Sequence, residues 1–250
     1  MSETSATAPI DRIWPDAAAD LDDAALLALT AFPPDRTWLR VNFIASIDGA
    51  SDREGRSGTL GDAADRRLFD LLRRPADVVL VGAGTLQTEG YGGLRVDDAS
   101  VAWRTDAGLP PHPVLATISR RLTLDPASAL FQDAPVRPIV YTTASAPAGR
   151  RETLSQVADV VTVGETDADL RRVRADLAAR GLHRIHSEGG PQVFGALLAS
   201  GAVDALHLTI APSLQAGGAR RIATGPAAPR DARLASVLRA GDELLLHYLL

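Results

Sequence analysis

The chain has 250 residues, of which 46% are hydrophobic, so it is long and apolar enough to bury one sizeable core or two small ones. It contains no cysteine and no lysine, which excludes disulfides, thiolate catalysis, Cys-ligated zinc, Schiff-base lysines and the phosphate-binding lysine of a Walker A loop. The formal net charge of -5 comes without a basic block, so we expect no nucleic-acid partner.

Residues 1–36 are predicted to be an N-terminal extension of a domain that runs from 37 to 250. The opening residues lack the basic start and apolar stretch of a secretory signal, and no apolar run reaches the roughly 18 residues of a membrane span. We therefore expect a cytoplasmic protein with no membrane partner. Within the extension, an Ala- and Leu-rich helix is predicted over 16–29, closed by Pro33-Pro34.

A strand, a helix and a second strand are predicted next. Apolar residues recur at every second position between Trp38 and Ile47, which is typical of a strand. Residues 62–73 have helical spacing, with Asp62 as the expected N-cap. The fully apolar run 78–81 predicts a short buried strand, which Gly82 ends.

The rest of the chain begins with a Gly-, Asp- and Pro-rich region over 90–113, which we expect to be a loop or flap. Short strands and helices then alternate, which favours βαβ units, a mostly parallel sheet and the α/β fold class. No repeat or obvious linker divides the chain, so a single domain is expected. The predicted strands lie at 114–118, 138–141, 160–163, 182–186, 205–210 and 243–249, and the helices at 168–180 and 191–199.

Two turns combine a strand end with glycines. The first is Val78-Val79-Leu80-Val81-Gly82-Ala83-Gly84-Thr85. A buried strand that leads into Gly-x-Gly lets backbone N–H groups approach a phosphate, because glycine has no Cβ to obstruct them. The same pattern is common at tight turns of α/β proteins, so from spacing alone a structural turn and a phosphate loop are equal interpretations.

The second turn is more specific, because a strand ends in Ser187-Glu188, Gly189-Gly190 turn the chain, and Pro191 starts a helix. Proline suits the first helical position, and the exposed N–H groups and helix dipole form an anion site at the carboxyl end of a strand. The pattern is not the G-x-G-x-x-G fingerprint of an ordinary Rossmann domain. Glu188 is either a capping or dipole partner of this helix or a hydrogen-bonding group for a ligand, and spacing leaves both open.

Four motifs occur in an order that resembles a known family. They are Ser46-Ile47-Asp48-Gly49, Val81-Gly82-Ala83-Gly84-Thr85, Glu188-Gly189-Gly190-Pro191, and Leu208-Thr209-Ile210-Ala211-Pro212 followed by Gly217-Gly218. From about Trp38 to Leu249 the set resembles the pyrimidine reductase domain of riboflavin biosynthesis, in its stand-alone actinobacterial form. The resemblance implies a three-layer αβα fold like that of dihydrofolate reductase, with a mostly parallel central sheet.

The resemblance also implies an activity. It predicts an NADPH-dependent oxidoreductase that turns the open ribosyl group of 5-amino-6-(5-phosphoribosylamino)uracil into ribityl, by hydride transfer to C1 of the sugar. The protein would hold donor and acceptor carbons close together in a water-poor cleft. It further implies a homodimer, which we expect to pair through the apolar strands Leu206–Pro212 and Leu244–Leu250.

The cofactor residues follow from the matched motifs. Ser46 lies on the cleft side, and Gly82, Gly84 and Thr85 would line the cofactor cleft. The second turn would meet the pyrophosphate and nicotinamide through Glu188, Gly189, Gly190, Pro191 and Gln192. Ser119 and Arg120 are placed to take the adenosine 2′-phosphate, a role that suits the planar donor fork of arginine. A solvated pair of Arg120 with Arg121 is the alternative interpretation.

The substrate residues that the resemblance implies are Asn42, Asp48, Arg73 and Glu89, with Glu89 and Glu188 as the catalytic candidates. Asp48 is equally explained as a turn former before Gly49, and Arg73 as a cation at a helix C-terminus. Asn42 stands where many family members have lysine, and Glu89-Gly90-Tyr91 replaces the family's Asp-Asn-Pro. Thr59-Leu60-Gly61 replaces Trp-Ile-Thr. All these departures fall on the substrate side.

Two other functions therefore stay open. The altered pocket would accept another pterin or pyrimidine, such as dihydrofolate, or the chain would bind a nucleotide without catalysis. A metal site is not expected, because His183 and His186, the close histidine pair, are three apart on a strand and face opposite sides.

Overall fold

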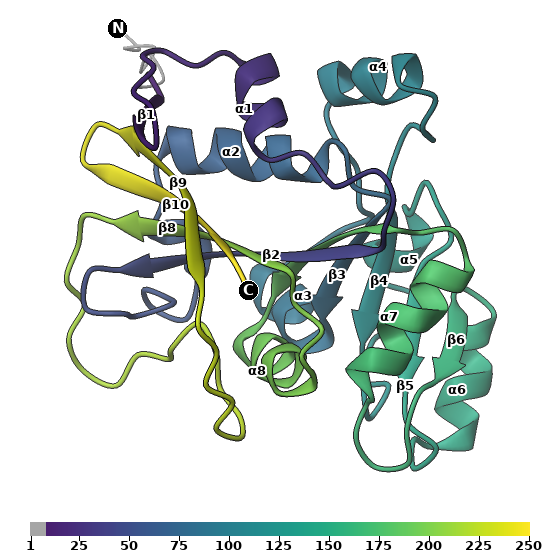
Figure 1. Ribbon diagram of the computed structural model, residues 1–250. Coiled ribbons are helices and arrows are strands. Elements are labelled where there is room, and N and C mark those ends of the chain that lie inside the picture. The colour runs from purple at the N-terminus through teal and green to yellow at the C-terminus, as the bar shows by residue number, and fades with distance from the viewer. Residues whose placement is uncertain (1–8) are drawn as a thin grey trace, which may run out of the picture.

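The computed structural model of the chain describes residues 9–250 as one mixed sheet with helices on both faces (Figure 1). The ten strands within that range follow the order β1-β9-β10-β8-β2-β7-β3-β4-β5-β6. Those from β8 to β6 in this order run parallel, as the alternation of strands and helices predicted. None of the helices in these 242 residues, 9 to 250, combines the length and the apolar character that crossing a membrane requires.

The parallel strands correspond to the apolar runs of the sequence. β3, for example, is buried at every position, because helices cover both faces of this part of the sheet. The parallel strands are β2 (Trp38–Ser46), β3 (Val78–Gly82), β4 (Val114–Ile118), β5 (Ile139–Thr142), β6 (Asp159–Thr162), β7 (Arg184–Gly189) and β8 (Ala205–Ala211).

An antiparallel end extends the sheet beyond β8 through β10 (Glu243–Leu249), β9 (Arg233–Ala240) and β1 (Asp11–Trp14). β8 hydrogen bonds to β2 and β10, and β10 hydrogen bonds to β8 and β9. Both strands are therefore interior, and the predicted pairing of these two strands across a two-fold axis is wrong, because neither has a free edge.

Helices cover the two faces of the sheet as separate layers. On one face, α7 (Leu170–Ala179) and α8 (Pro191–Ser200) pack against alternate strand residues such as Leu39 and Leu80. The intervening residues, such as Val79, face the other layer, which contains α3 (Ala83–Glu89), α5 (Ala129–Gln132) and α6 (Ala148–Ser155). On that same face, α1 (Asp23–Leu29) and α2 (Ala63–Arg73) cover the antiparallel end through Leu245 and its neighbours. The three-layer αβα arrangement is thus confirmed.

Several elements differ from those predicted. The N-terminal helix begins at Asp23 rather than near residue 16, because the Asp22 side chain accepts from Ala25 N and caps it there. The stretch before it contributes β1, which pairs with β9. The region expected to be a loop contains α4 (Asp98–Asp106), where the Asp97 side chain accepts from Ser100 N at 2.6 Å. β9, α5, α6 and the short 3₁₀ helix η1 (Ser57–Thr59) had not been predicted.

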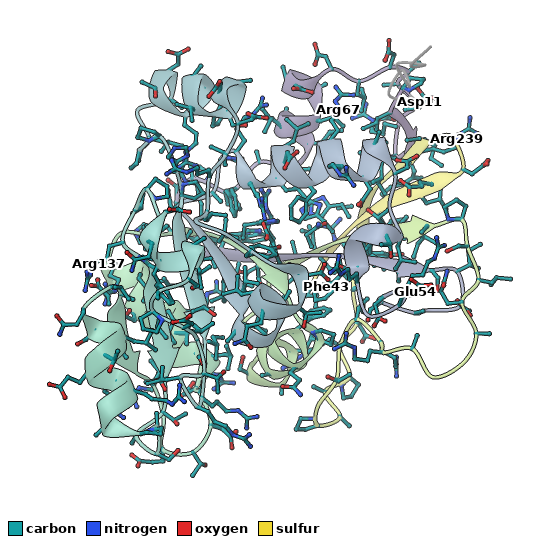
Figure 2. All side chains as sticks on the ribbon, turned by 180° about the vertical axis from the view of Figure 1, so that it is seen from behind. Asp11, Phe43, Glu54, Arg67, Arg137 and Arg239 are labelled. Carbon is teal, nitrogen blue, oxygen red and sulfur yellow. The ribbon has the colours of Figure 1, made fainter. Side chains whose placement is uncertain are left out.

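The segment before β2 packs onto the body of the protein. Arg67 on α2, labelled in Figure 2, donates from Nε to Asp23 Oδ1 at 2.9 Å and so links α2 to α1. Arg40 on β2 is 1% exposed and donates to the carbonyls of Thr30 and Leu72, at the C-terminal ends of α1 and α2. Helix C-termini carry partial negative charge, which stabilises this buried cation. Burial nevertheless lowers the pKa of Arg40 to about 9.

Candidate functional site

A cavity of about 590 Å³ opens where β2 and β7 end, between α2, the starts of α3 and α8, and the loop that follows α3. The carboxyl ends of parallel strands are where open α/β sheets bind ligands. The cavity brings together many of the predicted residues from distant parts of the chain. Those that line it are Asn42, Arg73, Gly84, Thr85, Glu89, Glu188, Gly190 and Pro191. The predicted residues that are not among its described lining are Ser46, Asp48, Gly82, Ser119, Arg120, Gly189 and Gln192.

The second glycine turn is built in a way that requires glycine. Gly189 has a φ of +78°, and a Cβ there would lie 2.2 Å from Cζ of Phe43. Gly190 has a φ of +34°, and its Cβ would lie 2.4 Å from Oγ1 of Thr85. Phe43, labelled in Figure 2, in turn stacks on Phe194 of α8 with ring centroids 5.0 Å apart. The turn therefore places the N-terminus of α8, which has Pro191 at its first position and no side-chain cap, directly beside the cavity.

The first glycine turn has looser steric demands. Gly82 has an ordinary φ of −69°, but a Cβ there would lie 2.9 Å from Val193 of α8. Gly84 is inside α3, and a Cβ there would meet nothing within 4 Å. Thr85, one residue further, is the point where this turn touches the second one. Gly84 and Thr85 thus face the cavity, whereas Gly82 serves the contact between α3 and α8.

The Glu188 carboxylate accepts three hydrogen bonds from cavity residues. Its side chain is 2% exposed, and both of its oxygens accept from Arg73 on α2, one of them from Nη2 at 2.7 Å. The Tyr91 hydroxyl donates to Oε2 at 2.8 Å. Burial by itself would lower the pKa of Arg73, but the Glu188 carboxylate outweighs it and holds that pKa above its ordinary value. Burial, and then the same carboxylate, raises the pKa of Tyr91, so the phenol keeps its proton.

Buried polar groups continue behind Glu188. His186 precedes it by two residues on β7, so both side chains are on the same face of the sheet. The imidazole is wholly buried, with Nδ1 3.4 Å from Nε of Arg40 and Nε2 3.7 Å from Oε1 of Glu188. Burial and then the cations Arg40 and Arg73 lower the pKa of His186 well below its ordinary value, so the ring is neutral.

One side of α2 forms a wall that the sequence analysis had not identified beyond Arg73. The residues of α2 that line the cavity recur at helical spacing. In the sequence this spacing gives a mostly polar stripe along the helix, beside the apolar stripe that faces the sheet. Burial raises the pKa of Asp65 within this stripe, so its carboxyl holds a proton to a higher pH than an exposed aspartate does. The stripe consists of Asp62, Asp65, Arg66, Phe69, Asp70 and Arg73.

The predicted substrate residues have different surroundings. Asn42 lines the cavity from β2, next to His207 of β8 in the sheet register. Glu89 also lines it, but its Oε1 accepts from both N and Oγ of Ser57 at 3.0 Å, so it anchors the loop that carries η1. Arg73 is engaged by Glu188, as described above. Glu89 and Arg73 are thus each held by a neighbouring element.

Ser46 and Asp48 belong to a turn that ties two loops together. Ser46 donates to Asp48, and the Asp48 carboxylate accepts from the backbone N–H of Gln215 and Ala216. The Ser46 hydroxyl, followed by the two backbone N–H groups, lowers the pKa of Asp48 to about 2. The alternative of a turn-forming Asp48 therefore agrees with its contacts.

The residues predicted for the 2′-phosphate lie at the carboxyl end of β4. Ser119 is buried, and its backbone N donates to the Tyr141 carbonyl. Arg120 is exposed and donates from Nη1 to Asp167 Oδ1 at 2.7 Å. Solvent screens this ion pair, because both side chains are exposed. A phosphate can therefore replace Asp167 at Arg120 with little loss of interaction free energy.

Residues 37–246 match the family described as the RibD C-terminal domain. The chain belongs to this family. The match covers every strand from β2 to β9 and most of β10, and therefore all the residues that line the cavity.

Proteins with sequences related to this chain have named activities. The chain is 26% identical over 210 residues to a 2,5-diamino-6-ribosylamino-4(3H)-pyrimidinone 5′-phosphate reductase of Archaeoglobus fulgidus, which covers 83% of this chain and 95% of that protein. It is 27% identical over 220 residues to the reductase of the same name from Methanothermobacter thermautotrophicus, with 85% and 98% covered.

A solved structure is similar to nearly the whole chain. It is that of a pyrimidine reductase-like protein from Corynebacterium diphtheriae, with a TM-score of 0.82 and 28% identity, covering 90% of this chain and 97% of that one. The expected fold, that of the riboflavin-biosynthesis reductases, is thereby confirmed.

Proposed function

We propose that this chain is an NADPH-dependent reductase of riboflavin biosynthesis, which converts the ribosyl group of a phosphoribosylaminopyrimidine into a ribityl group. The observation that carries the proposal is the Glu188–Arg73–Tyr91 cluster, set in a cavity beside the uncapped N-terminus of α8. The names of the related reductases support the same reaction. A small polar substrate, rather than a macromolecule, suits a cavity of about 590 Å³.

The cavity fits a dinucleotide at its glycine turns. Gly84 faces open space, so backbone can approach a ligand closely at the first turn, and the missing Cβ of Gly190 leaves room for Thr85 against the second turn. We assign the diphosphate to the free N–H groups at the start of α8, because helix N-termini favour anions. Reduced nicotinamide, when bound, supplies a hydride for C1 of the opened ribosyl group.

The side chains of the cluster orient the substrate. Arg73 offers a cation that is fixed by Glu188, and the Tyr91 oxygen and the Glu188 carboxylate offer acceptors for the hydroxyls of the sugar. The reduction also needs a proton, and Asp65 is a cavity carboxyl whose pKa burial raises, so we assign it as the proton donor. We assign Asn42, in place of the usual family lysine, to the polar edge of the pyrimidine.

Two pyrimidines fit the proposal and differ at one position of the ring. The sequence resemblance points to 5-amino-6-(5-phosphoribosylamino)uracil, which has an oxo group at position 2. The related archaeal reductases are named for the compound that has an amino group there. We expect the chain to reduce one of the two faster, since an oxo group needs a donor and an amino group an acceptor.

The test is a turnover assay with the purified full chain. NADPH is mixed with each pyrimidine phosphate, and the loss of NADPH absorbance is followed together with the product mass, which rises by two hydrogens. Reduction of either pyrimidine supports the proposal. Reduction of dihydrofolate alone would favour the pterin alternative, and cofactor binding without any turnover would favour a non-catalytic nucleotide-binding protein.

Cofactor preference depends on the exposed pair of Arg120 and Asp167. We assign Arg120 to the 2′-phosphate of NADPH, and Asp167 competes with that phosphate for it. Arg120→Ala is expected to weaken NADPH binding about tenfold while NADH binding stays the same. Equal losses for both cofactors would remove Arg120 from this role. The homodimer and the cytoplasmic localisation stay predictions.

A further inference from the structure

A buried histidine stands behind the carboxylate at the centre of the cavity. His186 has no solvent exposure, and its Nε2 has no hydrogen-bond partner among residues 9–250. Oε1 of Glu188 lies 3.7 Å from it, slightly beyond hydrogen-bond distance. Buried polar atoms normally have partners, so an unpaired one near a carboxylate of the cavity calls for an explanation.

Arg40 determines which ring nitrogen of His186 carries the proton. Its Nε donates to Nδ1 of His186, and an arginine can only donate, so Nδ1 is the acceptor of the neutral ring. Nε2 then carries the hydrogen, 3.7 Å from Oε1 of Glu188. Arg40 is itself held by the carbonyls of Thr30 and Leu72, so the orientation of the ring is fixed from behind.

Arg73 is the partner of Glu188 that an anionic ligand would disturb. It lines the cavity, and its Nη1 has no hydrogen bond within the described chain, while Nε and Nη2 donate to Glu188. A phosphate that binds Arg73 competes with Glu188 for the same guanidinium. The Oε1 atom, which accepts from Arg73 Nε, would then lose its donor, and His186 Nε2–H is 3.7 Å away from it.

We propose that His186 is a positioning residue for Glu188, which hydrogen bonds to Oε1 when an anionic ligand draws Arg73 away and so keeps the carboxylate ionised and in place. The inference rests on the proposed function, because it takes Glu188 to act in the reaction. In the structure Arg40 sets the tautomer of His186, and the Nε2 atom of His186 lies 3.7 Å from the oxygen that Arg73 would leave.

Two substitutions of His186 separate this role from simple packing. His186→Gln keeps a donor near the position of Nε2, whereas His186→Asn keeps an acceptor near Nδ1 for Arg40 and removes the donor that faces Glu188. We expect His186→Asn to lower kcat about tenfold, with KM little changed. We expect His186→Gln to retain most of the activity. Melting curves of both variants check that the chain remains folded.

The pH profile gives a second readout. Loss of a donor favours the protonated form of a carboxyl, so the acid limb of the kcat profile should move to higher pH in His186→Asn, by about one unit, and not in His186→Gln. The charged or titratable groups around Glu188 are otherwise the same in both variants. They are Arg73 and Asp70 from α2, Glu89 from α3, Tyr91 from the following loop, Arg40 from β2 and His207 from β8.

The opposite order of the variants would overturn the proposal. If His186→Gln is the more damaged variant, or if both lose activity equally with unshifted profiles, the histidine serves only to satisfy Arg40.

A readout without turnover keeps this test separate from that of the proposed function. The chain has 5 histidines, so ¹⁵N-histidine spectra of the full protein are simple to assign by the loss of one signal in His186→Asn. We expect the Nε2–H tautomer for His186, and a downfield shift of that proton when inorganic phosphate is added to the protein with reduced cofactor. An Nδ1–H tautomer, or a proton signal that phosphate leaves unmoved, contradicts the proposal even if the enzyme reduces a different substrate.

Discussion

The two glycine turns of this protein look alike in sequence but differ in what they demand of the chain. Both end a buried strand, both open a helix, and they touch where Thr85 meets Gly190. In the second turn both glycines have positive φ and face atoms that leave no space for a Cβ. In the first, Gly84 has free space and helical conformation. Glycine is therefore a structural necessity in one turn and an option in the other.

The difference shows at which turn the effect of a substitution on ligand binding can be measured separately from its effect on folding. A substitution in the second turn disturbs both at once, because Gly189 supports Phe43 as well as the start of α8. A substitution at Gly84 leaves the fold intact, so any effect on cofactor binding reports a direct contact. The following four substitutions test this contrast.

Glu188→Gln is expected to have the largest effect, because Glu188 provides the negative charge of the second turn that pairs with Arg73. Gln keeps the size of the side chain but loses the ion pair with Arg73, and turnover should fall about 100-fold. Steady-state kinetics measures this, and a melting curve checks folding. Glu89→Gln is the matched control, since its carboxylate binds Ser57, and we expect at most a tenfold loss. Equal losses would place both carboxylates in the reaction.

Gly189→Ala follows, with an effect on stability. A φ of +78° strains an alanine, and its Cβ would lie 2.2 Å from the Phe43 ring, so we expect a loss of at least about 2 kcal/mol in the free energy of unfolding. Thermal unfolding would show a fall in Tm of about 6 °C. A Tm within one degree of the parent would mean that the second turn tolerates side chains and that the contrast is false.

Thr85→Val is expected to have a smaller effect that is confined to binding. Valine has the same shape as threonine but no hydroxyl, so the contact with Gly190 is kept. If the hydroxyl donates to the cofactor, the Kd for NADPH rises about fivefold while Tm stays the same. Calorimetric titration measures the Kd. An unchanged Kd would limit Thr85 to holding the two turns together.

Gly84→Ala should have the smallest effect. Alanine is the better helix former, and its Cβ meets no atom within 4 Å, so we expect a stabilisation of about 0.5 kcal/mol. If backbone at this turn approaches the cofactor, the Kd rises about threefold in the same protein. A stabilised variant with full cofactor affinity would show that the first turn serves the fold alone.

Elements with a local signal were predictable from the sequence. The apolar alternation of β2 and the Asp62 cap of α2 depend on neighbouring residues, and both are found as predicted. β1 was missed because its partner, β9, lies more than 200 residues away and neither has strong alternation. α4 was missed because its short, polar composition resembles a loop, although Asp97 caps it in the ordinary way.

The site was predictable in its residues but not in their relations. The second turn and Arg73 were recognised separately, yet nothing in their spacing shows that Arg73 binds Glu188 across 115 residues. For the same reason Tyr91 was noted only as a departure from the family, whereas its hydroxyl contacts Glu188. His186 was considered only as a metal ligand, because a buried hydrogen-bond partner such as Arg40 has no sequence signature.

Arg40 connects the segment before residue 37 to the residues of the cavity, because it bonds to both Thr30 and His186. A fragment that starts at residue 37 would lack Thr30. It would therefore lack one of the two carbonyls that accept hydrogen bonds from the Arg40 guanidinium. The freed cation would tilt, and His186 would lose the contact that selects its tautomer. We therefore expect the smallest active unit to be longer than the matched region 37–246, because loss of α1 and the residues that follow it would reach Glu188 through Arg40 and His186.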